Sequence, residues 1–133
     1  MALAPTRLTA SQADIDAVTA VAREYIDSYA AGDAKRHARV YHPECTKRRY
    51  VADPDSGVTD LLVLSPQVMA DYAAASGPMD EGCEAEVVID DISDDLASVR
   101  IYSCRWIDFA HIVRARGDWR LFHVTWHGRG EAT

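Results

Sequence analysis

The segment spanning residues 107–126 constrains the fold more than any other. Two runs rich in apolar, aromatic and β-branched residues flank Arg116-Gly117-Asp118, the strong turn signal between them. This pattern predicts a β-hairpin, and a three-residue loop would place His111 opposite His123. A two-residue loop would change that pairing, so the register is a hypothesis.

Strict alternation divides the predicted hairpin into two faces. One face would carry Phe109, His111, Val113, Ala115, Trp119, Leu121 and His123, and the other Asp108, Ala110, Ile112, Arg114, Arg120, Phe122, Val124 and Trp126. We expect the face with the two histidines to point toward the helices and into a pocket. Asp108 would then lie on the opposite face, at a dimer contact or beside Arg100 or Arg105, unless a β-bulge reverses the facing.

The rest of the chain predicts helices first and most strands later. Ser11 and Asp14 resemble a capping box before an amphipathic helix, which Gly32 would end. Two further helices are predicted at 34–41 and 65–75, and further strands at 45–51, 61–64, 84–92 and 96–106. This order predicts an α+β fold, with three helices packed on a curved antiparallel sheet.

Length and composition predict one globular domain. The 133 residues, 48% hydrophobic and 26% charged, suit a single domain at 12–127 with a flexible leader at 1–11 and a tail at 128–133. The formal net charge of −7 argues against a nucleic-acid or anionic-membrane surface. No apolar run reaches the roughly 18 residues of a membrane span, and no signal peptide is evident. Cys45, Cys83 and Cys104 are expected to be free thiols in a reducing cytoplasm.

Several strings together resemble a known group of proteins. They are Tyr29-Ala30-Ala31-Gly32-Asp33, Tyr41-His42-Pro43-Glu44 with Lys47-Arg48, Leu96-Ala97-Ser98-Val99-Arg100, Asp108-Phe109-Ala110-His111 and Gly117-Asp118-Trp119-Arg120-Leu121. Over residues 12–127 the chain resembles the nuclear transport factor 2-like superfamily, and within it the family called putative lumazine-binding. This family is related to SnoaL-like cyclases and ketosteroid isomerase. The resemblance implies a cone-shaped, cystatin-like fold, a pocket between the helices and the concave sheet face, and a homodimer formed through the sheets.

The candidate catalytic residues are His111, His123 and Asp108. One imidazole would act as a base and its partner as a donor, because histidine titrates near neutral pH. Either Asp108 or the partner histidine would orient the base. His123 stands where the resemblance implies a smaller polar residue. The alternative interpretation is a pair of histidines that are simply hydrogen-bonded at the sheet edge.

The candidate ligand-binding residues are His42, Lys47, Arg48, Tyr25 and Tyr29. A cation beside a histidine at a pocket mouth suits a carboxylate, phosphate or enolate oxygen. The alternative places His42 at the end of the second helix and Lys47 and Arg48 in solvent. Tyr25 and Tyr29 lie on the buried stripe of the first helix, from which a hydroxyl can stabilise an oxyanion or simply be satisfied within the core.

Other chemistries lack their sequence signals. No zinc, facial-triad, serine-nucleophile, phosphate-loop or dinucleotide motif is present, so no metal or cofactor is expected.

Alternation places Tyr102, Trp106, Phe122 and Trp126 on the outer sheet face, which favours a homodimer. The sequence therefore predicts a small-molecule pocket protein, foremost a cofactor-independent isomerase, dehydratase or cyclase. A non-catalytic ligand-binding module and a dimeric scaffold are the alternatives.

Overall fold

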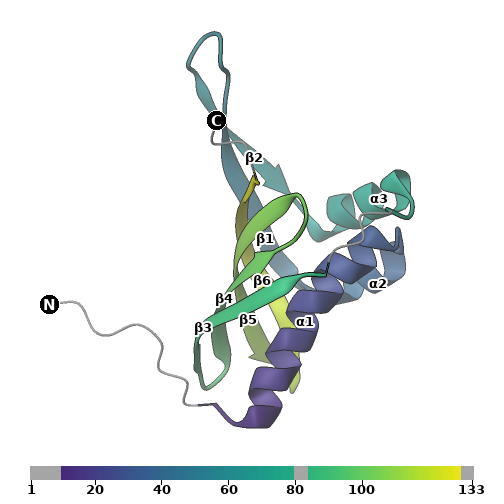
Figure 1. The fold of residues 1–133 in the computed structure, drawn as a ribbon, viewed down its shortest axis with the longest axis vertical. Coiled ribbons are helices and arrows are strands. Elements are labelled where there is room, and N and C mark those ends of the chain that lie inside the picture. The colour runs from purple at the N-terminus through teal and green to yellow at the C-terminus, as the bar shows by residue number, and fades with distance from the viewer. Residues whose placement is uncertain (1–9, 80–83, 130–133) are drawn as a thin grey trace, which may run out of the picture.

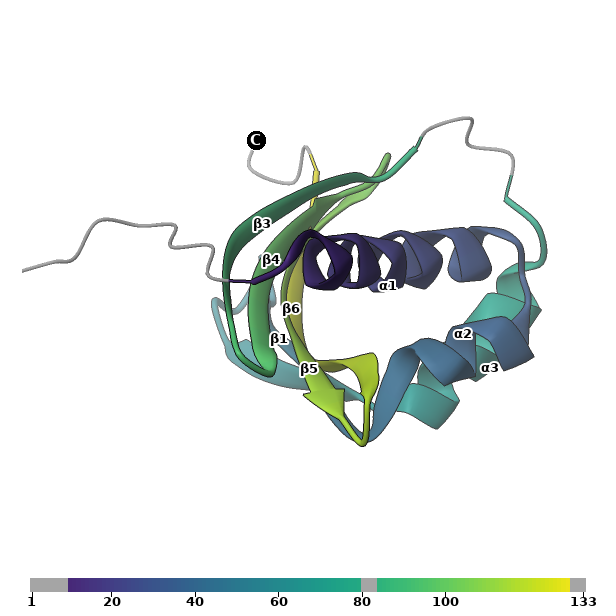
Figure 2. The ribbon, with the colours of Figure 1, turned by 90° about the horizontal axis from the view of Figure 1, so that it is seen from below.

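The computed structural model describes residues 10–79 and 84–129. Its elements are α1 (Gln12–Ala30), α2 (Ala34–Val40), β1 (Tyr41–Ala52), β2 (Thr59–Leu64), α3 (Pro66–Ser76), β3 (Glu86–Ser93), β4 (Leu96–Tyr102), β5 (Trp106–Ala115) and β6 (Asp118–Gly128). The six strands form one sheet in the order β2-β1-β6-β5-β4-β3, with β1 and β6 parallel and all other neighbours antiparallel. The predicted α+β fold is confirmed, and the helices lie on the concave face of the curved sheet (Figures 1 and 2).

Local sequence signals set the helix boundaries. The side chains of Ser11, Asp33 and Ser65 each accept a hydrogen bond from the backbone N–H three residues later, at 3.1–3.2 Å. After α1, Gly32 adopts a φ of 68°, and a Cβ there would lie 2.7 Å from the carbonyl carbon of Gly77. Only glycine fits this crossing between the end of α1 and the end of α3.

The register of the final hairpin differs from the predicted one near the turn. Ala115 pairs with Asp118, so the loop has two residues, Arg116 and Gly117, both at positive φ. This is the twist that suits a tight hairpin. Further along, His111 pairs with His123 as predicted, because β6 contains a bulge at Phe122. The bulge restores the pairing that the shorter loop would have shifted.

The prediction that the histidine face points inward is wrong. Asp108, Ala110 and Ile112 of β5 are the buried residues, whereas His111 is exposed. The concave face packs these side chains against α1, where Val18, Ala22 and Tyr25 are also buried. The bulge directs both Phe122 and His123 away from the core and returns Val124 to it. Asp108 therefore faces inward without any bulge in β5.

Two of the aromatic residues assigned to the outer sheet face lie elsewhere. Trp106 and Trp126 line a cavity on the concave side, because the inward face of β5 and β6 is the one that carries Asp108. Phe122 does lie on the outer face, where it is 40% exposed, and Phe109 on the same face is 44% exposed. The outer face is therefore less aromatic than predicted and carries histidines instead.

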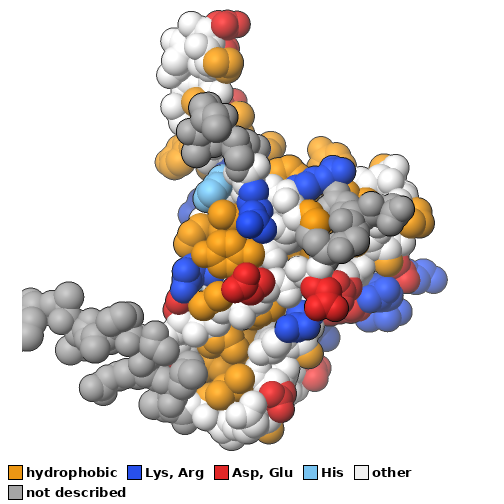
Figure 3. Space-filling model, viewed as in Figure 1, with side chains coloured by type: hydrophobic (Ala, Val, Ile, Leu, Met, Phe, Trp, Pro, Cys, Tyr) orange, Lys and Arg blue, Asp and Glu red, His pale blue; other side chains and the backbone are white. Residues whose placement is uncertain are grey.

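The β1–β2 hairpin forms an arm that extends beyond the body of the domain (Figure 1). Tyr50, Val58 and Val63 are among its most exposed side chains, and hydrophobic groups are visible along the arm in Figure 3. The base of the same arm contributes Leu62 and Leu64 to the cavity. The arm thus continues the sheet outward from the wall of the cavity.

The cysteines depart from the expectation of three free thiols. Cys104 is disulfide-bonded, and Cys45 is a buried free thiol. Cys83, the leader before residue 10 and the tail beyond residue 129 lie outside the described residues. None of the described helices is long and apolar enough to cross a membrane.

Candidate functional site

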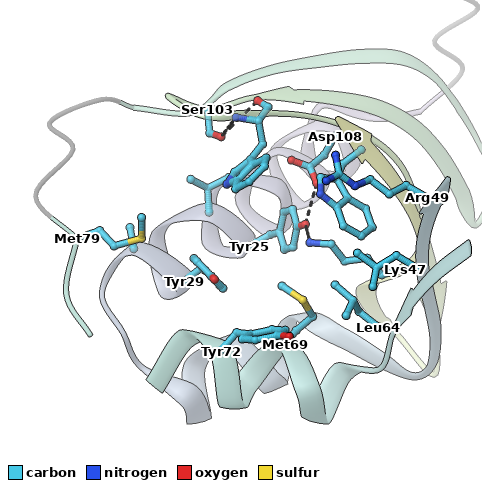
Figure 4. Close-up of a pocket in the computed structure, with 15 residues that line it drawn as sticks. Tyr25, Tyr29, Lys47, Arg49, Leu64, Met69, Tyr72, Met79, Ser103 and Asp108 are labelled. Carbon is cyan, nitrogen blue, oxygen red and sulfur yellow. Dashed lines mark hydrogen bonds between the residues drawn. The ribbon is translucent and has the colours of Figure 1, made fainter. Parts of the chain in front are cut away.

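A cavity of about 330 Å³ lies between the concave sheet face, α1 and α3 (Figure 4). Its walls are mostly aromatic and aliphatic: Tyr25, Ile26, Tyr29, Ala30, Leu62, Leu64, Met69, Tyr72, Met79, Trp106 and Trp126, with Lys47, Arg49, Ser103 and Asp108 as the polar groups. Its size is at the small end of typical ligand sites, and an apolar wall with a few polar groups is their usual composition.

Three buried polar side chains from three different elements meet at this cavity. Tyr25 of α1 donates its hydroxyl proton to Oδ1 of Asp108 on β5 over 2.8 Å, and Lys47 of β1 donates from Nζ to the Tyr25 oxygen. These residues are only 3%, 2% and 6% exposed, respectively. Tyr25 therefore links a buried cation to a buried carboxyl group, and each group constrains the orientation of the next (Figure 4).

Burial shifts the titration of all three groups. Desolvation lowers the pKa of Lys47 to about 8, although Asp108 and Cys45 act in the opposite direction. Burial also raises the pKa of Asp108, opposed by Lys47 and by the Tyr25 hydrogen bond. Burial and the nearby Asp108 carboxyl raise the pKa of Tyr25 well above its ordinary value, so that its hydroxyl stays protonated. An amine and a carboxyl whose pKa values have moved toward neutrality are suited to proton transfer.

The cation of Lys47 is enclosed by aromatic rings. Its Nζ lies 4.8 Å from the centre of the Trp126 ring and 4.9 Å from that of Tyr25. Arg49, two residues further along β1, lies 5.2 Å from the same Trp126 ring. Cation–π contacts of this kind stabilise positive charge where little water is present.

Behind Tyr25 lies a second buried hydrogen-bonded chain, centred on His37 of α2. Ser28 Oγ donates to the carbonyl oxygen of Glu24 over 2.6 Å, so toward His37 Nδ1, 2.9 Å away, it can only accept. Nδ1 therefore carries the proton, and Nε2 accepts the hydroxyl proton of Tyr41 over 2.9 Å. Burial and the nearby Lys47 lower the pKa of His37 to about 4, so the ring is neutral at neutral pH. It stacks on Tyr25 with ring centres 5.7 Å apart.

The cavity brings together only part of the predicted site. Asp108, Lys47, Tyr25 and Tyr29 line it, whereas His111 and the other histidine candidates do not.

The outer sheet face carries His111, His123 and Arg48 instead. The two imidazoles stack with centres 5.7 Å apart, and partial burial, His111 and Arg48 lower the pKa of His123. His42 accepts the backbone N–H of Glu44 and packs edge-on against Phe122. These four residues therefore do not belong to the cavity that holds Asp108.

Sequence reasoning missed Arg49, Trp106 and Trp126. Arg49 shares the inward face of β1 with Cys45 and Lys47, so alternation from Lys47 would have found it. Alternation correctly placed Trp126 on the same face of the hairpin as Asp108. That face was predicted to point outward, so the error for Asp108 carried over to Trp126. Within residues 10–79 and 84–129 no group of three or more metal-ligating side chains comes together.

This fold and this cavity define a small α+β domain of the nuclear transport factor 2-like class, with a pocket on the concave face of its sheet. The chain belongs to the family described as "Putative lumazine-binding", which matches residues 13–127.

Solved structures of the same fold include proteins of several descriptions. A nuclear transport factor 2-like protein of unknown function from Shewanella baltica is 21% identical, with a TM-score of 0.70 over 92% of this chain and 99% of that one. A putative scytalone dehydratase from Novosphingobium aromaticivorans is 15% identical, with a TM-score of 0.58 over 87% and 84%. A ketosteroid isomerase-like protein from Erwinia carotovora is 13% identical, with a TM-score of 0.59 over 90% and 99%. No curated protein sequence matches the chain. At these identities the likeness shows the fold alone.

Proposed function

We propose that the protein is a cofactor-independent acid–base enzyme of the isomerase or dehydratase type, acting on a small, largely apolar carbonyl compound. The observation that carries this proposal is the buried linkage of Lys47, Tyr25 and Asp108 at the wall of an apolar cavity. The fold of a dehydratase and of an isomerase-like protein is compatible with this activity but does not establish it.

Each of the three groups has a distinct role in the proposed reaction. The Asp108 carboxylate removes a proton from the carbon next to the substrate carbonyl, because its raised pKa makes it a stronger base than an ordinary aspartate. The Lys47 ammonium has two N–H donors besides the one directed at Tyr25, and these stabilise the enolate oxygen. Tyr25 holds both groups in place. This assignment predicts activity between the raised pKa of Asp108 and a pH of about 8, where Lys47 loses its proton.

Exchange of carbon-bound hydrogen for deuterium tests the proposal without a known substrate. The protein is incubated in D₂O with a panel of small aromatic and alicyclic ketones, and loss of the signal next to the carbonyl is followed by proton NMR. Asp108→Asn is expected to reduce exchange by about 10²-fold or more, the usual contribution of a general base. His111→Ala, on the outer face, is the matched control and is expected to exchange at the wild-type rate. Wild-type exchange by Asp108→Asn, or its loss in His111→Ala, would overturn the proposal.

A non-catalytic ligand-binding module is the second candidate. It is favoured by the cluster of Lys47 and Arg49 over the Trp126 ring, which suits capture of an aromatic anion as well as it suits turnover. Trp106 and Trp126 line the cavity and report its occupancy by fluorescence. Ketones that quench this fluorescence but exchange no hydrogen with the wild-type protein would replace the enzyme proposal with this one.

We further propose that the protein forms a homodimer through the outer sheet face. Phe109 and Phe122 are exposed there, beside His111 and His123. Phe109→Ser is expected to convert a dimer into a monomer by light scattering after size exclusion, while Val68→Ser on α3 leaves the mass unchanged. A monomeric wild-type protein would contradict the proposal.

A further inference from the structure

We propose that Lys47 also forms a covalent imine with small aromatic aldehydes and ketones that enter the cavity. This proposal uses the same cavity as the proposed function but a different chemical route, in which Lys47 is a nucleophile. The two therefore succeed or fail separately.

The placement of Lys47 suits a nucleophilic amine. The sequence contains only two lysines, Lys35 and Lys47. Lys35 is exposed on α2, whereas Lys47 lies at the cavity wall, 6% exposed, with an apolar space in front of it. Tyr25 holds the nitrogen in position, and Asp108 lies one hydrogen bond beyond. A lysine in a desolvated pocket beside a proton donor is the usual arrangement of imine-forming sites.

Burial supplies the reactive form of the amine. Only the unprotonated amine attacks a carbonyl carbon, and desolvation lowers the pKa of Lys47 from 10.5 to about 8. At pH 7.5 this leaves roughly two orders of magnitude more neutral amine than a lysine of ordinary pKa would have. The charges that bear on Lys47 act in both directions. Asp108 and Cys45 favour the ammonium, whereas desolvation between α1, β1, β5 and β6 opposes it and dominates.

The reaction balances with the groups present. The Lys47 nitrogen forms a bond to the carbonyl carbon, the carbon–oxygen π electrons move to oxygen, and a proton from the nitrogen is relayed to that oxygen to give a carbinolamine. Asp108 in its carboxylic acid form then protonates the hydroxyl group, the carbon–oxygen bond breaks and water leaves, so that a protonated imine and a carboxylate remain. The raised pKa of Asp108 keeps more of the acid form available.

The site also suits the product of this reaction. The protonated imine retains one positive charge, which would stay 4.8 Å from the Trp126 ring and gain the newly formed Asp108 carboxylate as a counter-ion. Tyr29, Tyr72 and Trp106 line the rest of the cavity and present flat apolar surfaces to an aromatic substituent. Carbonyl compounds with one or two rings are the class that this space favours.

Reductive trapping tests the proposal. The wild-type protein is incubated at pH 7.5 with benzaldehyde or 2-naphthaldehyde and sodium cyanoborohydride, and the adduct is measured by intact mass spectrometry and peptide mapping. We expect the mass to increase by that of the aldehyde less one oxygen atom, and Lys47 to be labelled at least ~10-fold faster than Lys35. This comparison is made within one folded protein, so it does not depend on the folding of a variant.

Variants assign the roles. Lys35→Arg is expected to leave labelling of Lys47 unchanged, Lys47→Arg to abolish it, and Asp108→Asn to slow it at least ~10-fold. Equal labelling of both lysines would overturn the proposal, and so would an unlabelled Lys47 when tryptophan fluorescence shows the aldehyde in the cavity. Exchange of ketone hydrogen with an unlabelled Lys47 would leave the acid–base function standing alone, and labelling without exchange would leave the imine alone.

Discussion

Acid sensitivity of the fold is expected to arise largely from the buried His37. In the folded protein its pKa is about 4, whereas in the unfolded chain it returns to about 6.5. Between these two values the unfolded chain binds a proton that the folded state does not, so the free energy of unfolding falls as the pH falls through this window. The linkage relation gives a loss of about 2 kcal/mol between pH 7 and pH 4.5, from a slope of at most ~1.4 kcal/mol per pH unit.

Urea denaturation at pH 7 and at pH 4.5, followed by tryptophan fluorescence, measures this loss. His37→Gln is expected to be less stable than the wild type at pH 7 by ~2 kcal/mol, because Ser28 and Tyr41 lose a buried partner. The same variant should lose about 2 kcal/mol less than the wild type on acidification. Asp108, whose pKa is raised, stabilises the folded state as the pH falls, but it does so in both proteins and cancels in the comparison.

His123 is the control, because its pKa is also lowered but it lies partly exposed on the outer face. His123→Gln is therefore expected to change the pH dependence far less than His37→Gln. Equal acid sensitivity of the wild type and His37→Gln would refute the view that a neutral, fully buried imidazole supports α2 and Tyr25.

Two further changes test the backbone. Gly32→Ala is expected to lower the free energy of unfolding by ~2 kcal/mol or more in urea titrations. The alanine would have to adopt a φ of 68° and place its Cβ 2.7 Å from the Gly77 carbonyl carbon. A loss below ~0.5 kcal/mol would show that the backbone relaxes at this crossing. Deleting Phe122, the bulged residue, keeps every inward residue of β6 inward, so circular dichroism should show the native fold at a cost of ~1–3 kcal/mol. Deleting Thr125 instead turns Trp126 outward and should remove its share of the tryptophan quenching by cavity ligands, leaving that of Trp106. Quenching at the full wild-type level would contradict the register.

The elements of the fold were predictable because their signals are local. Capping side chains, glycines and apolar periodicity lie within a few residues of the boundaries they set, and the predicted helix ends fall within two residues of those observed. The resemblance to the nuclear transport factor 2-like superfamily additionally predicted how the helices are layered on the sheet and that a pocket lies between them. The arm formed by β1 and β2 was only partly predicted, because its exposed strands bury no face that would impose an alternating pattern.

The orientation of the final hairpin was not predictable from its own residues. Both alternating sets contain apolar side chains interrupted by polar ones, so local pattern cannot choose the inward face. Two residues far away in sequence decide it: Asp108 is buried because Tyr25, 83 positions earlier, donates to it and Lys47 places a positive charge beside it. The histidines looked like the site because their chemistry is conspicuous, whereas an isolated aspartate looks like a surface residue until its partners are known.

The same contacts explain how a carboxyl group can be fully buried in the concave face and still be available for chemistry. A single buried ion pair in direct contact would hold both charges in fixed forms, because each stabilises the ionised state of the other. Here the Tyr25 hydroxyl lies between Lys47 and Asp108, so desolvation outweighs the attraction and moves both pKa values toward neutrality. His37, neutral and stacked behind Tyr25, supports this arrangement without adding a charge. The reactivity of the site thus depends on an uncharged residue that separates the two charged ones, and Tyr25→Phe should abolish it even though Tyr25 itself exchanges no proton with the substrate.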